Sequence, residues 1–205
     1  MKVKSELQSA TINTYENFYI TYTKKLLDTS VALFMLIPAI PLSVLLWLMI
    51  KIDSPGPVLY RQVRVGLNGK PFYIYKFRTM TDGISESEKP CDSSDPRITR
   101  VGKFLRKTSL DELPQLINVL KGEMSLVGPR PEMKWLVDQY YTDYERQRFL
   151  VKPGITGLWQ LSMDRTKPIH ENLHYDFEYI KNVSFMLDLK VLLKTLKVLF
   201  RCNTC

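Results

Sequence analysis

The sequence predicts a mainly α-helical protein with one small β-hairpin, in which a re-entrant helical hairpin enters a membrane beside one polar domain. Three observations support this fold class. An uncharged stretch of 22 residues runs from Thr29 to Ile50, strand-like segments flank one Asn-Gly turn, and amphipathic helical patterns occupy much of the remainder. The expected parts are an N-terminal interfacial segment at 1–25, a helix-break-helix membrane segment at 26–52 and a polar domain at 53–205.

The composition is that of a folded protein with a basic surface. The 205 residues include 29 Lys and Arg against 21 Asp and Glu, a formal charge of +8, and 45% of them are hydrophobic. This balance excludes collagen-like, disordered and disulfide-rich chains, and one long apolar stretch excludes a polytopic membrane protein. Cys91, Cys202 and Cys205 form no recognisable disulfide or zinc pattern, which favours a reducing compartment.

The apolar stretch is long enough to cross a bilayer, because a helix of this length rises about 33 Å. A secretory signal is disfavoured by its late start and the absence of a small-residue cleavage site, and a buried core helix would more often be shorter. Pro38 and Pro41 should break or kink it. Positive charge flanks both ends, with Lys24 and Lys25 before the stretch and Lys51 after it, so the charges favour a re-entrant hairpin over a kinked span.

Two further segments suggest amphipathic helices at a membrane surface or against the protein core. Four aromatic residues near the N-terminus share one helical face: Tyr15, Phe18, Tyr19 and Tyr22. Residues 184–201 predict a helix with a basic face: Lys190, Lys194, Lys197 and Arg201. Asp188 falls opposite these cations, in the first turn, where an acid complements the helix dipole.

The polar domain begins with a hairpin. Val58–Tyr60 and Phe72–Tyr75 predict strands on either side of Asn68-Gly69, a strong hairpin turn signal. A surface loop rich in Ser, Asp and Glu is expected at 83–96. Cations bracket that loop: Lys70, Lys76, Arg78, Arg97, Arg100, Lys103, Arg106 and Lys107. A strand end and a basic helix at 101–107 would point several of them into one cleft suited to phosphates, although each one alone is as well explained as a solvated surface charge.

An adjacent acidic pair follows the basic helix. Asp111 and Glu112 lie at a helix N-terminus in either of two interpretations, one with Ser109 as the N-cap of a capping box and one with Pro114 as the first helical residue. First-turn acids are common in helices without any chemical role. A carboxylate at this position also stays ionised and is able to act as a nucleophile, and its neighbour is able to hold a divalent cation through oxygen.

Two tight loops complete the pattern, at 127–131 and 153–157, the first of which presents Arg130 between two prolines. Together the segments resemble a monotopic polyprenol-phosphate phosphoglycosyl transferase of the bacterial sugar transferase family, in its minimal form. The matching pieces occur in family order: the Pro-broken apolar run, 75–80, 106–116, 118–125, 127–131, 152–160 and the region of Tyr179-Ile180.

The resemblance implies a function. A UDP-sugar would give its sugar-1-phosphate to a membrane polyprenol phosphate and release UMP, as the first membrane step of a surface glycan pathway. Asp111 would attack the β-phosphorus and form a covalent phosphosugar intermediate, and Glu112 would help to hold Mg²⁺ with Asp111 or assist the second half-reaction. The resemblance also implies a set of substrate-binding residues: Lys76, Arg78, Arg106, Arg130, Gln160 and Arg165.

One loop departs from the family pattern, because Leu161-Ser162 is followed by Met163-Asp164-Arg165 where the family commonly has Gly-Arg. This puts the placement of Arg165 in doubt. The expected location is the cytoplasmic face of a bacterial inner membrane, with residues 53–205 as the catalytic domain. The expected partners are a UDP-sugar, polyprenol phosphate, membrane lipid and a second copy of the chain, with no nucleic acid. The alternatives are a membrane-attached phosphodiesterase or phosphatase, and a non-catalytic basic module that binds anionic lipid.

Overall fold

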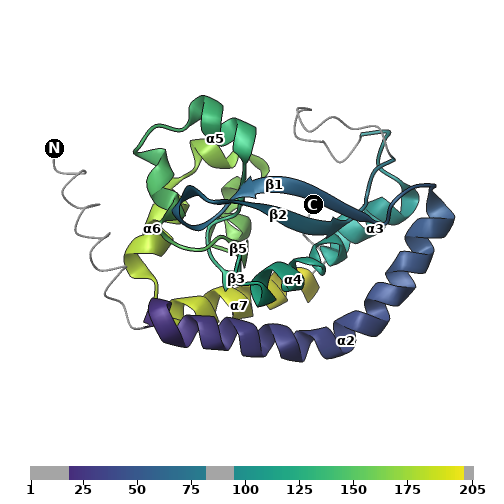
Figure 1. Cartoon of the computed structure of the whole chain (residues 1–205), viewed down its shortest axis with the longest axis horizontal. Helices are drawn as coiled ribbons and strands as arrows, with labels where there is room; N and C mark the ends of the chain where they lie inside the picture. Colours follow the sequence, from purple (N-terminus) through teal and green to yellow (C-terminus); the bar gives the residue numbers. More distant parts are fainter. Residues whose placement is uncertain (1–18, 82–94, 201–205) are drawn as a thin grey trace.

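The computed structural model describes residues 19–81 and 95–200 of the chain (Figure 1). Helices account for most of these residues, and two small sheets lie between them. A π-helical turn, η1 (Tyr19–Thr23), leads into one long helix that runs along an edge of the molecule, with the other elements on one side of it. The prediction of a mainly α-helical chain with a small hairpin is confirmed.

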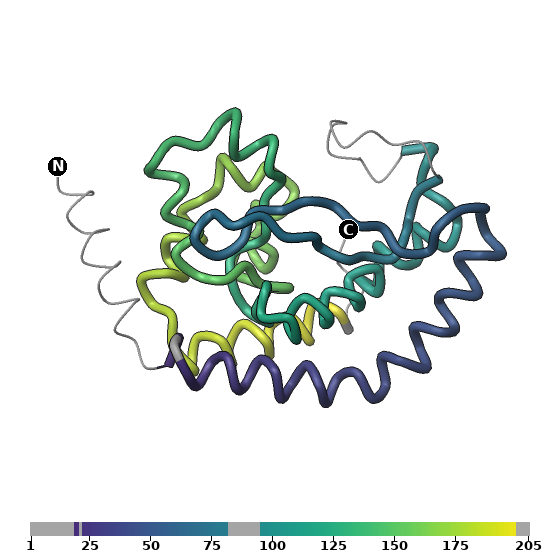
Figure 2. The backbone as a smooth tube through the Cα atoms, in the orientation of Figure 1, coloured from purple at the N-terminus to yellow at the C-terminus, as the bar shows by residue number. Residues whose placement is uncertain are grey.

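Helix α2 (Lys24–Asp53) contains the uncharged stretch and both of its prolines. It is continuous through Pro38 and Pro41 but bends along its length (Figures 1 and 2). Each proline lacks the N–H of one helical hydrogen bond and crowds the preceding turn, which kinks a helix where the surrounding turns still hold. The break expected at these residues is therefore a bend within one element and not an interruption.

Buried polar contacts hold the first turns of α2 on the domain. Lys24 forms an ion pair with Asp188 of the C-terminal helix. Asp28 accepts hydrogen bonds from Ser125 Oγ at 2.7 Å and from the backbone nitrogen of Leu126 at 3.2 Å. The side chains of these charged groups are buried, so losing one partner would leave the other charge uncompensated.

Apolar contacts hold the other end of α2 on the same domain. One core cluster combines residues of this end with residues of the hairpin and of the next helix: Leu46, Ile50, Val58, Phe77 and Leu105. Leu110 and Leu113 pack against this cluster while remaining partly exposed. Both ends of α2 therefore contact one domain, which lies along one side of the helix (Figure 2).

The predicted hairpin is present, and its strands are longer than expected. Strands β1 (Leu59–Val65) and β2 (Pro71–Phe77) pair antiparallel around a 3₁₀ turn, η2 (Leu67–Gly69). Asn68 adopts the left-handed conformation, with φ 54°, which this residue tolerates better than most. The two-residue strand β4 (Glu132–Met133) pairs with the other edge of β1 and makes a three-stranded sheet.

The basic helix and the segment after it confirm one of the two interpretations of the acidic pair. Helix α3 (Arg100–Thr108) ends at Ser109, which has a left-handed φ of 55° and makes no side-chain cap hydrogen bond. A 3₁₀ turn, η3 (Leu110–Glu112), follows, and helix α4 (Gln115–Leu120) begins directly after Pro114. The capping box is therefore wrong, because Ser109 ends α3 and its side chain caps no backbone N–H of the turn that follows.

The two tight loops lie side by side. Strands β3 (Ser125–Val127) and β5 (Gly154–Thr156) pair in parallel and bring the loops together. A Cβ atom at Gly154 would overlap the backbone nitrogen of Gly128, so the contact requires glycine. The backbone around Arg130 is thereby fixed from a segment more than twenty residues away in the sequence.

The remaining helices surround these loops. They are α5 (Lys134–Tyr140), α6 (His174–Asn182) and α7 (Phe185–Phe200), with 3₁₀ segments η4 (Glu145–Leu150), η5 (Trp159–Leu161), η6 (Met163–Thr166) and η7 (Ile169–Glu171). The predicted C-terminal helix is confirmed by α7. Asp188 in its first turn is buried and accepts hydrogen bonds from Tyr19 and Tyr179, a role in packing that its position opposite the lysines did not indicate.

The predicted aromatic face is described only in part, because Tyr15 and Phe18 lie outside the described residues. Tyr19 packs edge-to-face on Phe185 with ring centroids 6.3 Å apart, whereas Tyr22 is 65% exposed. The cysteines and most of the predicted surface loop also lie outside the described residues.

Large apolar side chains are exposed along α2. Among the described residues, α2 is the one helix long and apolar enough to cross a membrane. Apolar residues exposed along α2 include Phe34, Ile37, Ile40, Val44 and Leu45, and α7 adds Met186, Leu193 and Leu196. Exposed apolar surface of this extent indicates contact with lipid or with another protein.

Candidate active site

The acidic pair lies on a short turn between two helices. Asp111 and Glu112 belong to η3, and the left-handed Ser109 redirects the chain there after α3. Both carboxylates are partly buried and lie within reach of Lys76 near the end of β2. A residue pair that the sequence placed at a helix N-terminus thus lies against the β-hairpin.

Two cations from separate segments neutralise this pair. The Nζ atom of Lys76 lies 2.6 Å from Oε1 of Glu112 and 3.9 Å from Oδ2 of Asp111. Nη1 of Arg130, from the loop after β3, lies 3.7 Å from the same Glu112 oxygen. Four of the predicted site residues therefore meet at one place, although they are spread over more than fifty residues of sequence.

The surroundings give the two carboxyl groups different affinities for protons. Burial raises the pKa of Asp111, with Glu112 adding to the effect and the charges of Lys76, Arg130 and Arg106 opposing it. Burial acts to raise the pKa of Glu112 as well, but Lys76 and Arg130 outweigh it and lower that pKa to about 2. Glu112 is thus held as a carboxylate in an ion pair, while Asp111 is the more basic group, as a nucleophile requires.

A small pocket opens beside this cluster. Its wall includes Lys76, Glu112 and Arg130, together with Arg64 of β1 and Gln115 of α4, which the sequence analysis did not assign to a site. Burial and the charge of Arg130 lower the pKa of Arg64 to about 10, so Arg64 is cationic at neutral pH. Three cations therefore line the pocket beside the acidic pair, and cations in this arrangement suit the oxygens of a diphosphate.

Two other predicted arginines differ in what they contact. Arg106 donates from Nε to Thr79 Oγ1 at 3.0 Å, and its charge acts on Asp111. Arg78 is buried, and its Nη2 atom donates to the carbonyl and hydroxyl oxygens of Ser54 at 2.7 and 2.9 Å. The structure thus brings Arg106 to the acidic pair and places Arg78 against the turn that follows α2.

Gln160 and Arg165 lie in the segment after β5. Gln160 donates to the carbonyl oxygen of Ile155 at 3.3 Å. Ile155 lines the pocket, so Gln160 contacts the pocket wall through this residue. The neighbouring Trp159 ring lies 5.9 Å from the guanidinium of Arg130. Arg165 lies half-buried in η6, and in the part of the chain that the structure describes no ion pair joins it to the acidic pair.

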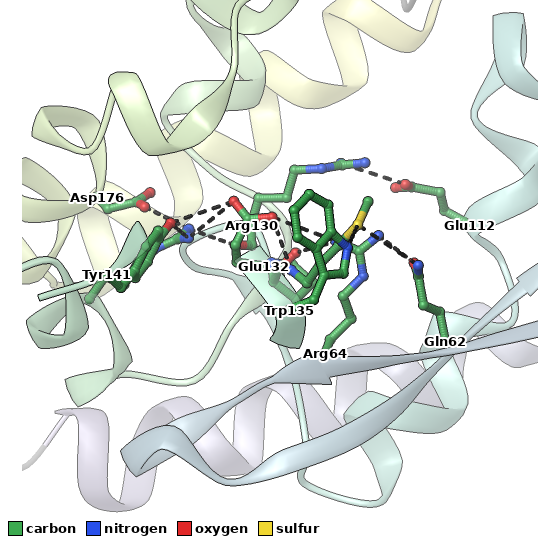
Figure 3. A network of polar contacts seen from close by, with 11 residues as sticks. Gln62, Arg64, Glu112, Arg130, Glu132, Trp135, Tyr141 and Asp176 are labelled. Atoms are coloured by element: carbon green, nitrogen blue, oxygen red, sulfur yellow. Dashed lines mark hydrogen bonds and ion pairs between the residues drawn. The ribbon is translucent and has the colours of Figure 1, made fainter. Parts of the chain in front are cut away.

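A buried network of charges supports the loop that carries Arg130 (Figure 3). Arg148, only 1% exposed, forms an ion pair of 2.7 Å with Asp176 and lies 3.8 Å from Glu132. Its guanidinium also donates to the Tyr141 hydroxyl at 2.9 Å and to the Arg130 carbonyl oxygen at 2.6 Å. No local sequence pattern indicates this network, because its members lie in four separate segments and resemble ordinary polar surface residues.

The acidic pair supplies oxygen donors of the kind that a magnesium ion prefers. Among the described residues, no group of three or more His, Cys, Asp or Glu side chains is placed to hold a metal. Asp111 and Glu112 supply carboxylate oxygens, the donors that Mg²⁺ prefers, and Mg²⁺ is commonly held by one or two carboxylates together with substrate phosphates. Two carboxylates therefore suit a Mg²⁺ ion whose other ligands come from the substrate phosphates, and not one held by protein side chains alone.

Comparisons with known proteins show the family of the chain. The family model for bacterial sugar transferases matches residues 19–202. The chain is 42% identical over 196 residues to the undecaprenyl-phosphate galactose phosphotransferase of Salmonella typhimurium, covering 88% of this chain and 41% of that protein. It is 41% identical over 182 residues to the UDP-glucose:undecaprenyl-phosphate glucose-1-phosphate transferase of Escherichia coli, covering 84% of this chain and 39% of that protein.

A shorter relative is matched over most of both chains. The sugar transferase EpsL of Bacillus subtilis, which is named as uncharacterized, is 42% identical over 176 residues, covering 85% of each protein. The chain thus spans about two fifths of the length of the Salmonella and Escherichia relatives and most of the Bacillus one. The matched region includes α2, the acidic pair and both glycine loops. The chain belongs to the bacterial sugar transferase family.

Proposed function

We propose that the protein transfers a sugar-1-phosphate from a UDP-sugar to a membrane polyprenol phosphate and releases UMP. The observation that carries this proposal is the placement of Asp111 beside Lys76, Glu112 and Arg130, at a cationic pocket next to an apolar helix. The names of the relatives support it, because they describe transfer of galactose or glucose phosphate to undecaprenyl phosphate.

The first half-reaction is a displacement at phosphorus. A carboxylate oxygen of Asp111 attacks the β-phosphorus of the UDP-sugar, and a new oxygen–phosphorus bond forms. The bond between that phosphorus and the bridging oxygen breaks, and its electron pair leaves with UMP. Lys76, Arg64 and Arg130 neutralise the charge that moves onto the phosphate oxygens, which is the main service a protein gives to phosphoryl transfer.

The second half-reaction returns the enzyme to its starting state. A phosphate oxygen of the polyprenol phosphate attacks the same phosphorus, the bond to Asp111 breaks, and the carboxylate is restored. Glu112 remains ionised throughout, because its pKa is about 2, and holds Lys76 and Arg130 in place. Asp111 and Glu112 would hold Mg²⁺ together with the substrate phosphates, and the ion would supply further neutralisation of phosphate charge.

The placement of α2 supports a re-entrant position in the cytoplasmic face of a bacterial inner membrane. Lys24 and Asp28 at one end, and Leu46 and Ile50 at the other, contact the same polar domain. A helix that crossed the bilayer would have its ends on opposite sides, where one domain of this size could not contact both. The bend at Pro38 and the exposed apolar side chains are consistent with a helix that dips into one leaflet.

The test is UMP release by the purified full chain with Mg²⁺, polyprenol phosphate and a panel of UDP-sugars. Asp111→Asn should abolish release, whereas Asp138→Asn, an exposed carboxyl paired only with Lys134 among the described residues, should not. With the acceptor omitted, intact mass measurement should show a sugar-phosphate adduct on the wild type and none on Asp111→Asn. An active Asp111→Asn variant would contradict the assignment of the nucleophile.

The same assay separates the alternatives. A phosphodiesterase or phosphatase would release sugar phosphate or inorganic phosphate into water without any lipid acceptor. A non-catalytic lipid-binding module would bind anionic vesicles and release no UMP from any donor. The panel also identifies the sugar, on which the named relatives differ.

A further inference from the structure

An exposed tryptophan lies beside the cationic pocket without a role in the chemistry above. Trp135, in the first turn of α5, is 37% exposed. Its indole nitrogen donates to Met133 Sδ at 3.2 Å, and Met133 is paired across the sheet with Arg64 of the pocket wall. Figure 3 draws the indole in one group with Arg64 and Arg130.

The membrane does not explain this exposure. Helix α5 lies on the side of the domain remote from α2 (Figure 1), so Trp135 is far from the apolar surface. Packing in the core does not explain it either, because more than a third of the side chain is open to solvent. An aromatic ring that is held by its neighbours and still exposed is suited to stack on a flat ligand group.

The cations next to Trp135 indicate what kind of group that is. Arg64 reaches from the pocket wall to Gln62, whose amide oxygen accepts from its Nη2 at 2.7 Å, and Gln62 in turn lies 3.8 Å from Met133 Sδ. A chain of contacts thus joins Arg64 of the pocket wall to Met133, the residue to which the indole donates. A ligand that fits both parts carries phosphate at one end and an aromatic ring at the other, as a nucleoside diphosphate does.

We propose that Trp135 forms the nucleobase subsite of the donor substrate, with the base stacked on the indole and the diphosphate against Arg64, Lys76 and Arg130. This inference rests on the proposed function, because it assumes a nucleotide-linked donor. Stacking on an aromatic ring uses the face of the base, so the subsite contributes affinity for the nucleotide without contacting the reacting phosphorus.

The experiment measures equilibrium binding of UMP and of inorganic pyrophosphate to the full chain in detergent by calorimetry. Trp135→Ala should weaken UMP binding about tenfold or more, while Trp135→Phe should retain most of it, because a phenyl ring still stacks. Pyrophosphate binding should be unchanged in both variants, since it uses the cations alone. Tyr140→Ala is the matched control, because Tyr140 is a 56% exposed aromatic residue of the same helix.

The outcomes are distinct. Equal UMP affinity in the wild type and Trp135→Ala would overturn the subsite. Equal losses of UMP and pyrophosphate binding would overturn it as well, since they would show a disturbed pocket in place of a lost stacking partner. A wild type that neither binds UMP nor releases it would instead refute the proposed function, and with it this inference.

Discussion

The guanidinium of Arg148 donates a hydrogen bond of 2.6 Å to the carbonyl oxygen of Arg130, the residue whose side chain reaches Glu112. A fully buried cation thus holds the backbone of a half-buried one. Asp176, 2% exposed, balances the charge of Arg148, and burial raises the pKa of Asp176 to about 6 despite the opposing effect of Arg148. The position of Arg130 at the pocket therefore depends on residues that never meet a substrate.

Removing Arg148 should destabilise the protein strongly. Arg148→Met would leave Asp176 and Glu132 buried without their cation, at a cost of about 3–5 kcal/mol in the free energy of unfolding. The double variant Arg148→Met/Asp176→Asn should be more stable than Arg148→Met, because one uncompensated charge is gone. Denaturant unfolding in detergent, followed by circular dichroism, measures both. A double variant no more stable than the single one would show that the ion pair is not the source of the loss.

Enlarging Gly154 should displace the loop that carries Arg130. A Cβ at Gly154 overlaps the backbone of Gly128, so Gly154→Ala should lower UMP release by at least about tenfold, since misplacement of a charged group by an ångström costs that order of rate. Gly69→Asn is the control, because its left-handed turn accepts Asn and no atom lies within 4 Å of the added Cβ. Full activity of Gly154→Ala would mean that the loop contact does not position Arg130.

The pH dependence of the first half-reaction should report on Asp111. In the proposed mechanism only the ionised carboxyl of Asp111 attacks phosphorus, so the rate should fall as the pH drops through the raised pKa of Asp111. Arg106 lowers that pKa, and Arg106→Gln should therefore raise it and move the acid limb of the rate profile to higher pH. Lys103→Gln, an exposed cation of the same helix, should leave the limb in place. An acid limb that is the same in wild type and Arg106→Gln would argue against ionisation of Asp111 as its origin.

The first turn of α2 and the hairpin that follows this helix should label from the same side of the membrane. With the three native cysteines replaced by serine, single cysteines at Lys25 and Lys70, both exposed, should react with a membrane-impermeant maleimide in inverted vesicles and not in intact cells. The expectation follows from the contacts of both ends with one domain. Reaction of the two positions from opposite sides would show that the helix crosses the bilayer.

Features set by neighbouring residues could be predicted from the sequence. The Asn-Gly turn, the basic helix and the C-terminal helix follow from local periodicity and turn chemistry, and the structure has all three. The acidic pair was also located correctly, although Ser109 proved to end a helix and not to begin one. The left-handed conformation of Ser109 depends on where the next element packs, and local sequence patterns do not encode that packing.

Features set by distant contacts were missed. Arg64 and Gln115 line the pocket because the hairpin and α4 meet there, and nothing in either segment alone distinguishes them from other polar residues. Arg78 was expected among the substrate-binding cations, and the structure shows its guanidinium donating to Ser54. Asp188 appeared to serve the helix dipole and is a partner of Lys24. Each of these outcomes depends on tertiary packing that one sequence does not show.

The leucines on either side of the acidic pair pack against the core formed with α2. Leu110 and Leu113 contact the cluster that contains Leu46, so the position of Asp111 relative to α2 is fixed by core packing. If α2 lies in one leaflet, this packing sets the distance of Asp111 from the membrane, and that distance decides which phosphates can reach the phosphosugar on Asp111. A phosphate at headgroup level would reach the phosphosugar on Asp111 without leaving the bilayer. Thickening or thinning the bilayer should therefore slow the lipid half-reaction and leave the reaction with the soluble donor unchanged.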